Sequence, residues 1–251
     1  MGLAICGGFT VELPQFLLND KPDLVGDCRT TEAVILDDGT LGAVRIEGFF
    51  ADSAAKSIHD LLANGVVYER DDIGDTKRAN RAAREGDLPD DPIRVAMIGD
   101  KSYDEAWEAL TVFEGDWFLE QLGLWLGLPL RVLRPSTPYR LDVGDYIDPH
   151  DDYPAPEYRL SVAYNLSMFS DQYRGGATAI GLVDSVEEYD HDDFFFPLKR
   201  WALKAGEQTL RPVFNSLLLI PLSGSHAHAV RTVTDGPRYS VTTLYGACTK
   251  A

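Results

Sequence analysis

The feature that most constrains the fold is a change in sequence pattern after Pro129. From there the chain runs through short segments rich in β-branched and aromatic residues, which Gly, Pro, Asp and Ser separate. The preceding half instead contains stretches with helical periodicity. Helices followed by about eight closely spaced strands predict a mainly β, α+β protein. We therefore expect a double-stranded β-helix, or jelly roll, over residues 131–251, supported by helices within residues 1–130.

Two helical regions are predicted in the first half of the chain. After Ala51, apolar residues recur at helical spacing as far as Gly65, which predicts a helix over about residues 53–64. In the segment 102–126, a stripe of aromatic residues and leucines is interrupted around Gly115, which predicts one kinked helix or two. The simplest interpretation of the stripe is a core face packed on a sheet.

Three further segments can be interpreted from their composition. The turn dipeptide Asp38–Gly39 lies between two apolar runs and predicts a β-hairpin. Residues 69–95 are polar and rich in Gly and Asp, so we expect a mobile surface loop that contributes little core. Residues 182–210 are expected to form a long acidic loop, either a lid or a solvated insertion. The aromatic residues to watch there are Phe194, Phe195, Phe196 and Trp201.

Composition bears on domain count, partners and compartment. The chain has 251 residues, of which 45% are hydrophobic. We therefore expect residues 1–251 to form a single domain. A formal net charge of −17 disfavours nucleic acid as a partner, because phosphate backbones would be repelled. No segment reaches the roughly 18 apolar residues of a membrane span. The three cysteines are far apart and suggest no disulfide framework, so a reducing cytoplasm is the expected location.

His150 and Asp152 form the first half of a candidate metal site. They stand two residues apart near the end of an alternating strand, and a period of two would place both side chains on one face. An imidazole and a carboxylate on one face suit a divalent first-row metal if a third ligand comes from a neighbouring strand. Taken alone, the pair proves little, because an H-x-D sequence is common and also describes a loop histidine in an acidic stretch.

The second half of the candidate site lies near the end of the chain. A buried apolar strand runs into Gly224 and is followed by His226 and His228. A turn at residues 235–237 then delivers Arg238 onto the next strand. Such a hairpin would bring His228 and Arg238 together on adjacent strands, both facing into the same roll. One side chain would bind the metal and the other would bind an acid.

In this order the motifs resemble those of the prolyl 4-hydroxylase-like branch of the 2-oxoglutarate/Fe(II) oxygenases. The resemblance covers about residues 139–246, and no family motif is found before it. The pattern consists of an H-x-D, an R-x-S strand, a Gly-Gly, an N-x-L strand, an H-x-V and a second R-x-S. Here these are His150–Asp152, Arg159–Ser161, Gly175–Gly176, Asn215–Leu217, His228–Val230 and Arg238–Ser240. Such an ordered set is far more specific than any single motif.

The resemblance implies that His150, Asp152 and His228 bind Fe(II). His226 is the alternative to His228, which is favoured because it alone has the H-x-V context and the family's spacing to the arginine. Asp151 should point away from the metal, since one residue along a strand reverses the face. The remaining two histidines are expected to be ordinary surface residues: His59 and His191.

The resemblance also implies a site for the co-substrate. Arg238 would pair with the distal carboxylate of 2-oxoglutarate, because a guanidinium matches carboxylate geometry, and Ser240 would add a hydroxyl. Relatives often carry a tyrosine on the strand after H-x-D, which contacts the co-substrate. At that place this chain has Tyr164 and Asn165, and either could make the contact. The rivals of Arg238 elsewhere in the chain are Arg231 and Arg211.

The activity implied by the resemblance uses Fe(II), 2-oxoglutarate and dioxygen to oxidise an unactivated carbon. Relatives that halogenate carry a small residue where this chain has Asp152, so we expect hydroxylation. The expected substrate is a small molecule such as an amino acid or a natural-product intermediate. The alternatives are a peptidyl hydroxylase, a desaturase, cyclase or halogenase of the same fold, and a non-catalytic, cupin-like metal-binding module. Arg238 and Ser240 argue against the last, which needs no carboxylate clamp.

Overall fold

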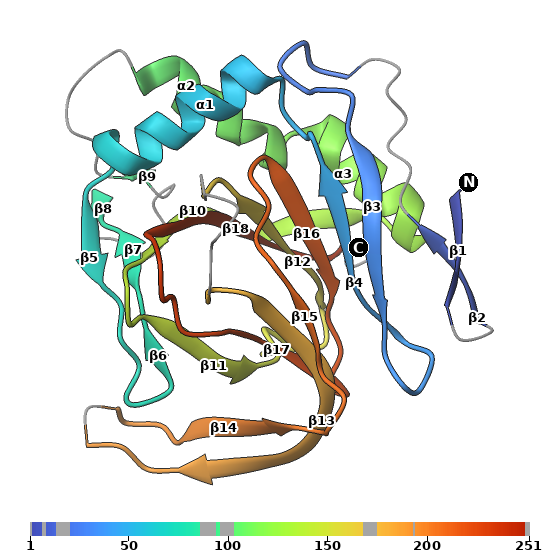
Figure 1. Ribbon diagram of the computed structural model, residues 1–251, viewed down its shortest axis with the longest axis vertical. Helices are drawn as coiled ribbons and strands as arrows, with labels where there is room; N and C mark the ends of the chain where they lie inside the picture. The colour runs from blue at the N-terminus through green and yellow to red at the C-terminus, as the bar shows by residue number, and fades with distance from the viewer. Residues whose placement is uncertain are drawn as a thin grey trace.

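The protein consists of two antiparallel β-sheets that face each other, with helices on the outer side of the larger sheet (Figure 1). The computed structural model describes residues 2–6, 9–13, 21–85, 94–95, 103–167, 175–192 and 194–248. The predicted double-stranded β-helix with supporting helices is confirmed. The helices that the structure describes are all too short or too polar to span a bilayer.

The larger sheet has eight strands and takes its members from both halves of the chain. Its order is β3 (Arg29–Ile35), β4 (Leu41–Glu47), β16 (Ser216–Pro221), β12 (Tyr158–Asn165), β18 (Arg238–Ala247), β10 (Leu130–Leu141), β7 (Asn80–Ala82) and β5 (Tyr68–Arg70). The predicted hairpin at Asp38–Gly39 is confirmed as the β3–β4 turn, where Gly39 has a φ of +83°. The backbone N–H of Thr40 donates to the Asp38 carboxylate there, at 2.9 Å.

The smaller sheet has six strands and closes the other side of the roll. Its order is β14 (Leu198–Leu203), β13 (Thr178–Tyr189), β17 (His226–Val230), β11 (Tyr146–His150) and β6 (Lys77–Arg78), and β15 (Gln208–Leu210) also pairs with β13. Two separate strand pairs complete the described part: β1 (Gly2–Cys6) with β2 (Phe9–Leu13), and β8 (Arg84–Glu85) with β9 (Arg94–Val95).

The helices form where the periodicity predicts them. The first is α1 (Asp52–Asp60), which continues as a π-helical turn over Leu61–Gly65. The second region is divided, as its interruption predicts, into α2 (Asp104–Leu110), a 3-10 turn (Thr111–Glu114) and α3 (Asp116–Leu126). Gly115 is the N-cap of α3 and has an extended backbone, which breaks the helix at the predicted position.

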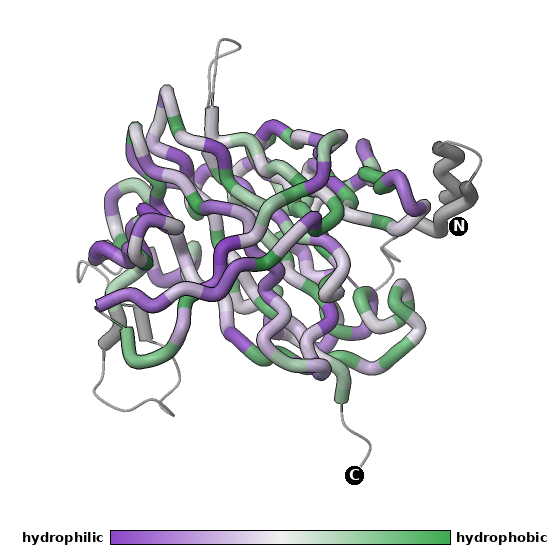
Figure 2. The backbone as a smooth tube through the Cα atoms, turned by 90° about the horizontal axis from the view of Figure 1, so that it is seen from below, coloured by the Kyte–Doolittle hydropathy of each residue, from purple (hydrophilic) through white to green (hydrophobic). Residues whose placement is uncertain are grey.

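The main core lies between these helices and the outer face of the eight-stranded sheet. The alternation along β12 sends Leu160, Val162 and Tyr164 outward into this core, where all are almost fully buried. The rings of Phe49 and Phe113 stack there with centroids 5.3 Å apart. The predicted aromatic stripe is part of this core, because Trp107, Trp117 and Trp125 pack against it. Along the strands in Figure 2, hydrophobic and hydrophilic residues follow one another closely, as two-faced strands require.

Two segments predicted as loops are instead built into the sheets. The described part of residues 69–95 forms the short strands β5 to β9, and it buries Ala79 and Ala82 completely or almost so. The prediction is wrong because short edge strands are held by backbone pairing, which polar side chains do not prevent. Residues 182–210 are not an open loop either, since β13 and β14 form a long hairpin that β15 follows. We refer to residues 182–203 as the β13–β14 arm.

Candidate metal centre and co-substrate pocket

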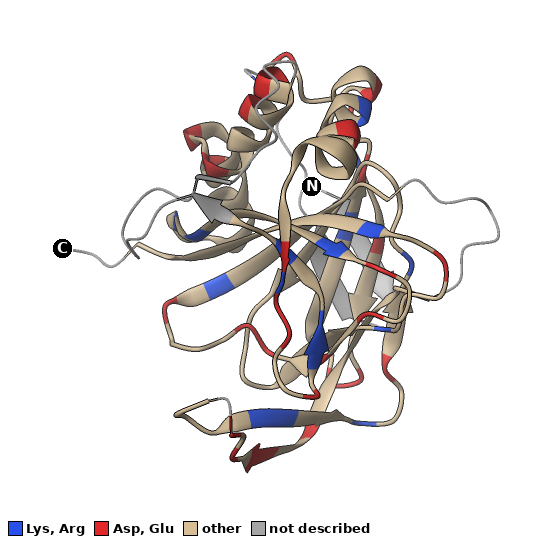
Figure 3. Cartoon of the chain, turned by 90° about the vertical axis from the view of Figure 1, so that its left-hand side faces the viewer, with Lys and Arg blue, Asp and Glu red and all other residues tan. Residues whose placement is uncertain are grey.

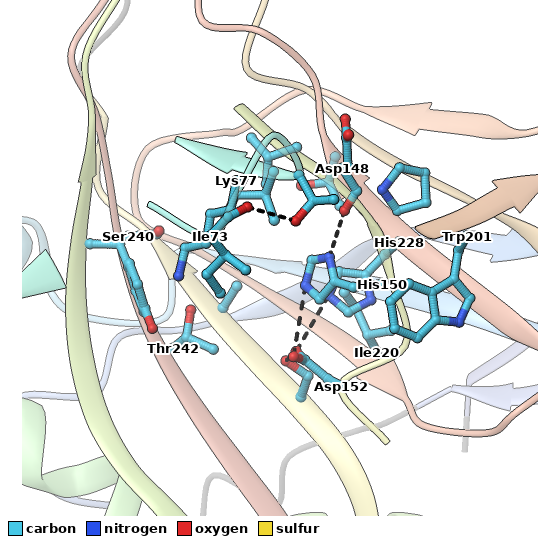
Figure 4. A pocket seen from close by; sticks show the side chains of 18 of the residues that line it. Ile73, Lys77, Asp148, His150, Asp152, Trp201, Ile220, His228, Ser240 and Thr242 are labelled. Atoms are coloured by element: carbon cyan, nitrogen blue, oxygen red, sulfur yellow. Dashed lines mark hydrogen bonds and ion pairs between the residues drawn. The ribbon is translucent and has the colours of Figure 1, made fainter. Parts of the chain in front are cut away.

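His150, Asp152 and His228 converge at one point inside the roll (Figure 4). One ligand atom from each lies within 4.8 Å of the others. The Asp152 carboxylate is 3.7 Å from Nε2 of His150 and 3.4 Å from Nε2 of His228. The two imidazole rings have centroids 4.2 Å apart. This convergence leaves room for one ion between two nitrogens and one oxygen.

The two histidines meet because their strands are neighbours in the six-stranded sheet. β11 and β17 are antiparallel, and His150 is the direct cross-strand partner of His228. An irregularity between Ile147 and His150 shifts the register just before the ligand. Side chains of directly opposed residues stand about 4.5–5.5 Å apart at Cβ, so register alone brings the imidazoles together.

Asp152 reaches the site by a different route from the one that the sequence suggested. It lies beyond the end of β11, and its backbone is left-handed, with a φ of +49°. Strand alternation therefore does not explain why it shares a face with His150. The loop turns the carboxylate back toward the histidines, and the Ser161 hydroxyl donates to it at 3.2 Å. Asp151 accepts a hydrogen bond from the backbone N–H of Tyr153 and is not part of the ligand cluster, as expected.

The protonation states of His150 and Asp152 suit a metal. Burial and the nearby His228 lower the pKa of His150 to about 4, so its imidazole is neutral at pH 7. Its Nδ1–H donates to the Asp148 carbonyl at 2.9 Å, which leaves Nε2 for a metal. Burial would raise the pKa of Asp152, but His150 and His228 outweigh it and hold that pKa well below its usual range. Neutral imidazoles and an ionised carboxylate are the forms that bind metal, and this donor set fits Fe(II).

His226 is occupied elsewhere, which confirms the choice of His228 as the ligand. The His226 side chain is buried, and Nε2–H donates to the Pro221 carbonyl at 2.6 Å. The Ser223 hydroxyl lies 2.9 Å from its Nδ1. Both ring nitrogens therefore already have partners, and His226 does not belong to the ligand cluster.

A cavity of about 420 Å³ connects the metal centre with the inner face of the eight-stranded sheet. β12 contributes Ser161 and Ala163 to its wall, and β16 contributes Leu218 and Ile220. The far end is polar, because β18 presents three side chains with donors, Arg238, Ser240 and Thr242. A ligand in this cavity would meet a metal at one end and a cation with hydroxyls at the other.

Arg238 lies in this cavity with 3% of its surface exposed. Its Nη2 donates to the Asn165 side-chain oxygen at 3.2 Å. The predicted hairpin neighbourhood with His228 is wrong, because β17 belongs to the six-stranded sheet and β18 to the eight-stranded sheet. The two side chains instead approach the cavity from opposite layers. The rival arginines do not line the cavity: Arg231 pairs with Glu207, and the carbonyl of Arg211 accepts from Arg45.

Tyr164 and Asn165, the two candidates for an additional co-substrate contact, have different surroundings. Tyr164 faces away from the cavity into the main core, and its hydroxyl donates to Asn215 at 3.0 Å. The interpretation of Tyr164 as a co-substrate contact is therefore wrong, because strand alternation points it to the opposite face of β12. Asn165 touches Arg238 and does not itself line the cavity. Its position suits a residue that orients the guanidinium.

Several cavity residues escaped the sequence interpretation. Thr242 could have been found, since it follows Ser240 by two residues on the same face of β18. Lys77 could not be found, because it comes from a segment that is predicted to be a loop. Its Nζ pairs with Asp71 at 2.6 Å. Other cavity residues that the sequence did not single out include Arg134, Tyr139 and Asp148.

His59, which is predicted to be a surface residue, is half-buried, and its ring lies against those of Phe214 and Tyr239.

Comparison with known proteins agrees with this geometry. Residues 137–246 match the 2OG-Fe(II) oxygenase superfamily. No curated protein matches the chain. An oxidoreductase of the 2OG-Fe(II) oxygenase family from Burkholderia pseudomallei superposes with a TM-score of 0.52 at 19% identity, covering 84% of this chain and 87% of that one.

Two solved prolyl hydroxylases have a similar fold. The enzyme from Trichoplax adhaerens, in complex with a peptide fragment of hypoxia inducible factor, gives a TM-score of 0.51 at 14% identity, over 82% of this chain and 84% of its own. A prolyl-4-hydroxylase from Pseudomonas putida gives 0.51 at 15% identity, over 85% and 97%. At such identities the likeness is one of fold.

A roll of two antiparallel sheets with a His-Asp-His cluster inside it is the arrangement expected of a non-haem Fe(II) oxygenase. Residues 137–246 belong to the 2OG-Fe(II) oxygenase superfamily, and they contain the iron-binding triad His150, Asp152 and His228. Fe(II) and the co-substrate 2-oxoglutarate are typical of this family.

Proposed function

We propose that this enzyme hydroxylates an unactivated carbon of a small molecule, such as an amino acid or a natural-product intermediate. The observation that carries the proposal is the two-ended cavity, with the triad at one end and Arg238, Ser240 and Thr242 at the other. Its volume of about 420 Å³ lies within the range of small-molecule sites.

Arg238 is the residue that we assign to the distal carboxylate of 2-oxoglutarate. A buried guanidinium pairs well with a planar carboxylate, and Ser240 and Thr242 offer hydroxyls beside it. Asn165 supports the arrangement by accepting a hydrogen bond from Arg238. Arg134, which also lines the cavity, stands opposite Leu244 on β18, near the same end.

The remaining residues bind, orient and exclude water. Ser161 and the Asp148 carbonyl hold Asp152 and His150 in place, while Ala163, Leu218 and Ile220 form an apolar wall. When bound, the iron with 2-oxoglutarate and dioxygen supplies the oxidising chemistry, with succinate as a co-product. We assign hydroxylation because Asp152 occupies the position that a halide would need.

The test combines the purified enzyme with Fe(II), 2-oxoglutarate and oxygen and screens a library of amino acids and metabolites. Succinate release and a substrate mass gain of one oxygen are measured together. We expect at least one small molecule to give both signals. Iron binding without succinate under any condition would instead indicate a metal-binding module, and a chlorinated or desaturated product would contradict hydroxylation.

A further inference from the structure

The β13–β14 arm is fastened to the opposite edge of its own sheet. Asp75, in the turn before β6, pairs with Arg200 of β14 at 2.6 Å and accepts a hydrogen bond from the Tyr189 hydroxyl at 3.1 Å. The Tyr146 hydroxyl donates to the Asp75 carbonyl at 2.8 Å. The Arg200 guanidinium also lies over the Tyr189 ring, 4.8 Å from its centroid. We call Asp75, Tyr146, Tyr189 and Arg200 the Asp75 clasp.

The clasp is reinforced by a close backbone approach at Gly74. This glycine has a φ of +50°, and a Cβ placed on it would lie 3.2 Å from the His191 ring and 3.3 Å from Leu198. Both neighbours belong to the arm. A side chain at this position would crowd both neighbours, and the positive φ favours glycine.

Both segments that the clasp joins, the turn before β6 and the arm, also line the cavity. The turn contributes Ile73 and Thr76, and the arm contributes Phe196, Leu198 and Trp201. In the view of Figure 4, Trp201 is drawn next to His150 and His228, and all three side chains line the same cavity.

The clasp itself faces solvent. The side chains of Asp75 and Arg200 are 67% and 43% exposed. Figure 3 shows the arm at the foot of the roll, with basic residues on one strand and acidic residues on the other. An exposed ion pair contributes little stability, so this contact can open and close without unfolding the roll. Phe195 and Phe196, near the end of the arm, are exposed as well.

We propose that Trp201 is a specificity-determining residue, which the Asp75 clasp positions so that its indole packs against an apolar, aliphatic or aromatic group of the substrate beside the metal. This inference rests on the proposed function and adds the chemical class of the group that is oxidised. Trp201 touches the substrate, whereas Asp75 and Arg200 act through the arm and are positioning residues.

The test is binding of small probes to the Zn(II)-loaded protein with 2-oxoglutarate, in which no turnover occurs. Ligand-observed NMR measures the affinity of phenylacetamide and cyclohexanecarboxamide against that of benzylamine and benzoate. We expect the two neutral probes to bind more tightly than the two charged ones. Trp201→Ala should weaken the neutral probes by at least about tenfold, as for a central aromatic contact, and Trp201→Phe should retain part of the affinity.

Phe195→Ala is the matched control, since Phe195 is exposed on the same arm and does not line the cavity. It should leave probe binding unchanged. Equal binding of charged and neutral probes, or full affinity in Trp201→Ala, would overturn the assignment. The proposed function fails separately, if the wild-type enzyme forms no succinate from 2-oxoglutarate with any small molecule.

A charge exchange tests the clasp. Asp75→Arg and Arg200→Asp should each weaken the neutral probes, by up to about fivefold for an exposed pair, and high salt should weaken the wild type similarly. The double exchange should restore part of the affinity, because it keeps the ion pair but not the Tyr189 contacts, while the melting temperature and Zn(II) affinity stay constant in all variants. Single variants that bind like the wild type, or a double variant that binds no better than the single variants, would overturn the positioning role.

Discussion

At the scale of single residues, His226 and His228 stand two apart on β17 but have different tasks. His228→Ala removes a ligand, so Fe(II) binding should be lost. His226→Ala removes hydrogen bonds to Pro221 and Ser223 and should cost about 1–3 kcal/mol of stability while iron binding is retained. Anaerobic Fe(II) titration and thermal unfolding measure the two effects. The reverse pattern of iron loss would contradict the ligand assignment.

Arg238 offers a test of the co-substrate site. Arg238→Ala should raise the 2-oxoglutarate requirement roughly 30- to 150-fold, because a charge-assisted hydrogen bond is worth about 2–3 kcal/mol. Iron binding should change little, since Arg238 comes from the opposite sheet. Titration of 2-oxoglutarate with Zn(II)-loaded protein gives the affinity. Arg231→Ala is the control. If Arg231→Ala raised the 2-oxoglutarate requirement and Arg238→Ala did not, Arg231 would be the residue that binds the co-substrate.

The backbone conformation at Asp152 suits a substitution by glycine. Its φ of +49° is a conformation that glycine adopts without strain, so Asp152→Gly should fold normally and lose only the ligand. We expect weaker iron binding, loss of most hydroxylation and little or no chlorination, because the substrate must also be positioned for halide transfer. Product isotope patterns with added chloride measure this. Hydroxylation at the wild-type rate would show that Asp152 is not a ligand.

At the scale of elements, Asn215 joins the start of β16 to the end of β4. Its side chain accepts from the Phe50 N–H and donates to the Phe50 carbonyl, and it also accepts from Tyr164. Asn215 has a φ of +57°. This explains the N-x-L motif as a structural joint.

The contacts of Asn215 predict how strongly different substitutions destabilise the protein. Asn215→Ala should destabilise by about 3 kcal/mol or more, and Asn215→Gly by about 1 kcal/mol less, because glycine tolerates the left-handed backbone. Tyr164→Phe should cost about 1 kcal/mol without changing 2-oxoglutarate affinity. Urea unfolding at constant m-value gives these differences. A raised 2-oxoglutarate requirement in Tyr164→Phe would reinstate its predicted contact with the co-substrate.

Elements with their own periodicity were predictable from sequence, and elements defined by pairing were not. The helices and the β3–β4 hairpin follow from spacing and a turn dipeptide, and the motif order places the three ligands. β5 to β7 are too short for any pattern, and they exist because sheet edges accept them. The cross-strand register of His150 with His228 and the left-handed Asp152 are likewise tertiary facts. No local signal separates β17 and β18 into different sheets.

At the scale of the whole molecule, the N-terminal half is part of the roll. β4 pairs with β16, and Arg70 binds the buried Asp145 carboxylate through both terminal nitrogens at 3.0 Å. We propose that residues 1–251 unfold as one domain. Calorimetry should give a single transition with equal calorimetric and van't Hoff enthalpies. A fragment of residues 131–251 should not fold, because the outer face of its sheet would be bare; a folded fragment or two transitions would contradict this.

The two ends of the cavity belong to different layers. The triad is carried by the six-stranded sheet and the loop after β11, whereas Arg238, Ser240 and Thr242 all come from β18 of the eight-stranded sheet. A dicarboxylic acid held at both ends would tie the layers together across the interior. Co-substrate and metal would then act jointly as a cross-brace, so hydrogen exchange should slow in strands of both sheets only when both are present.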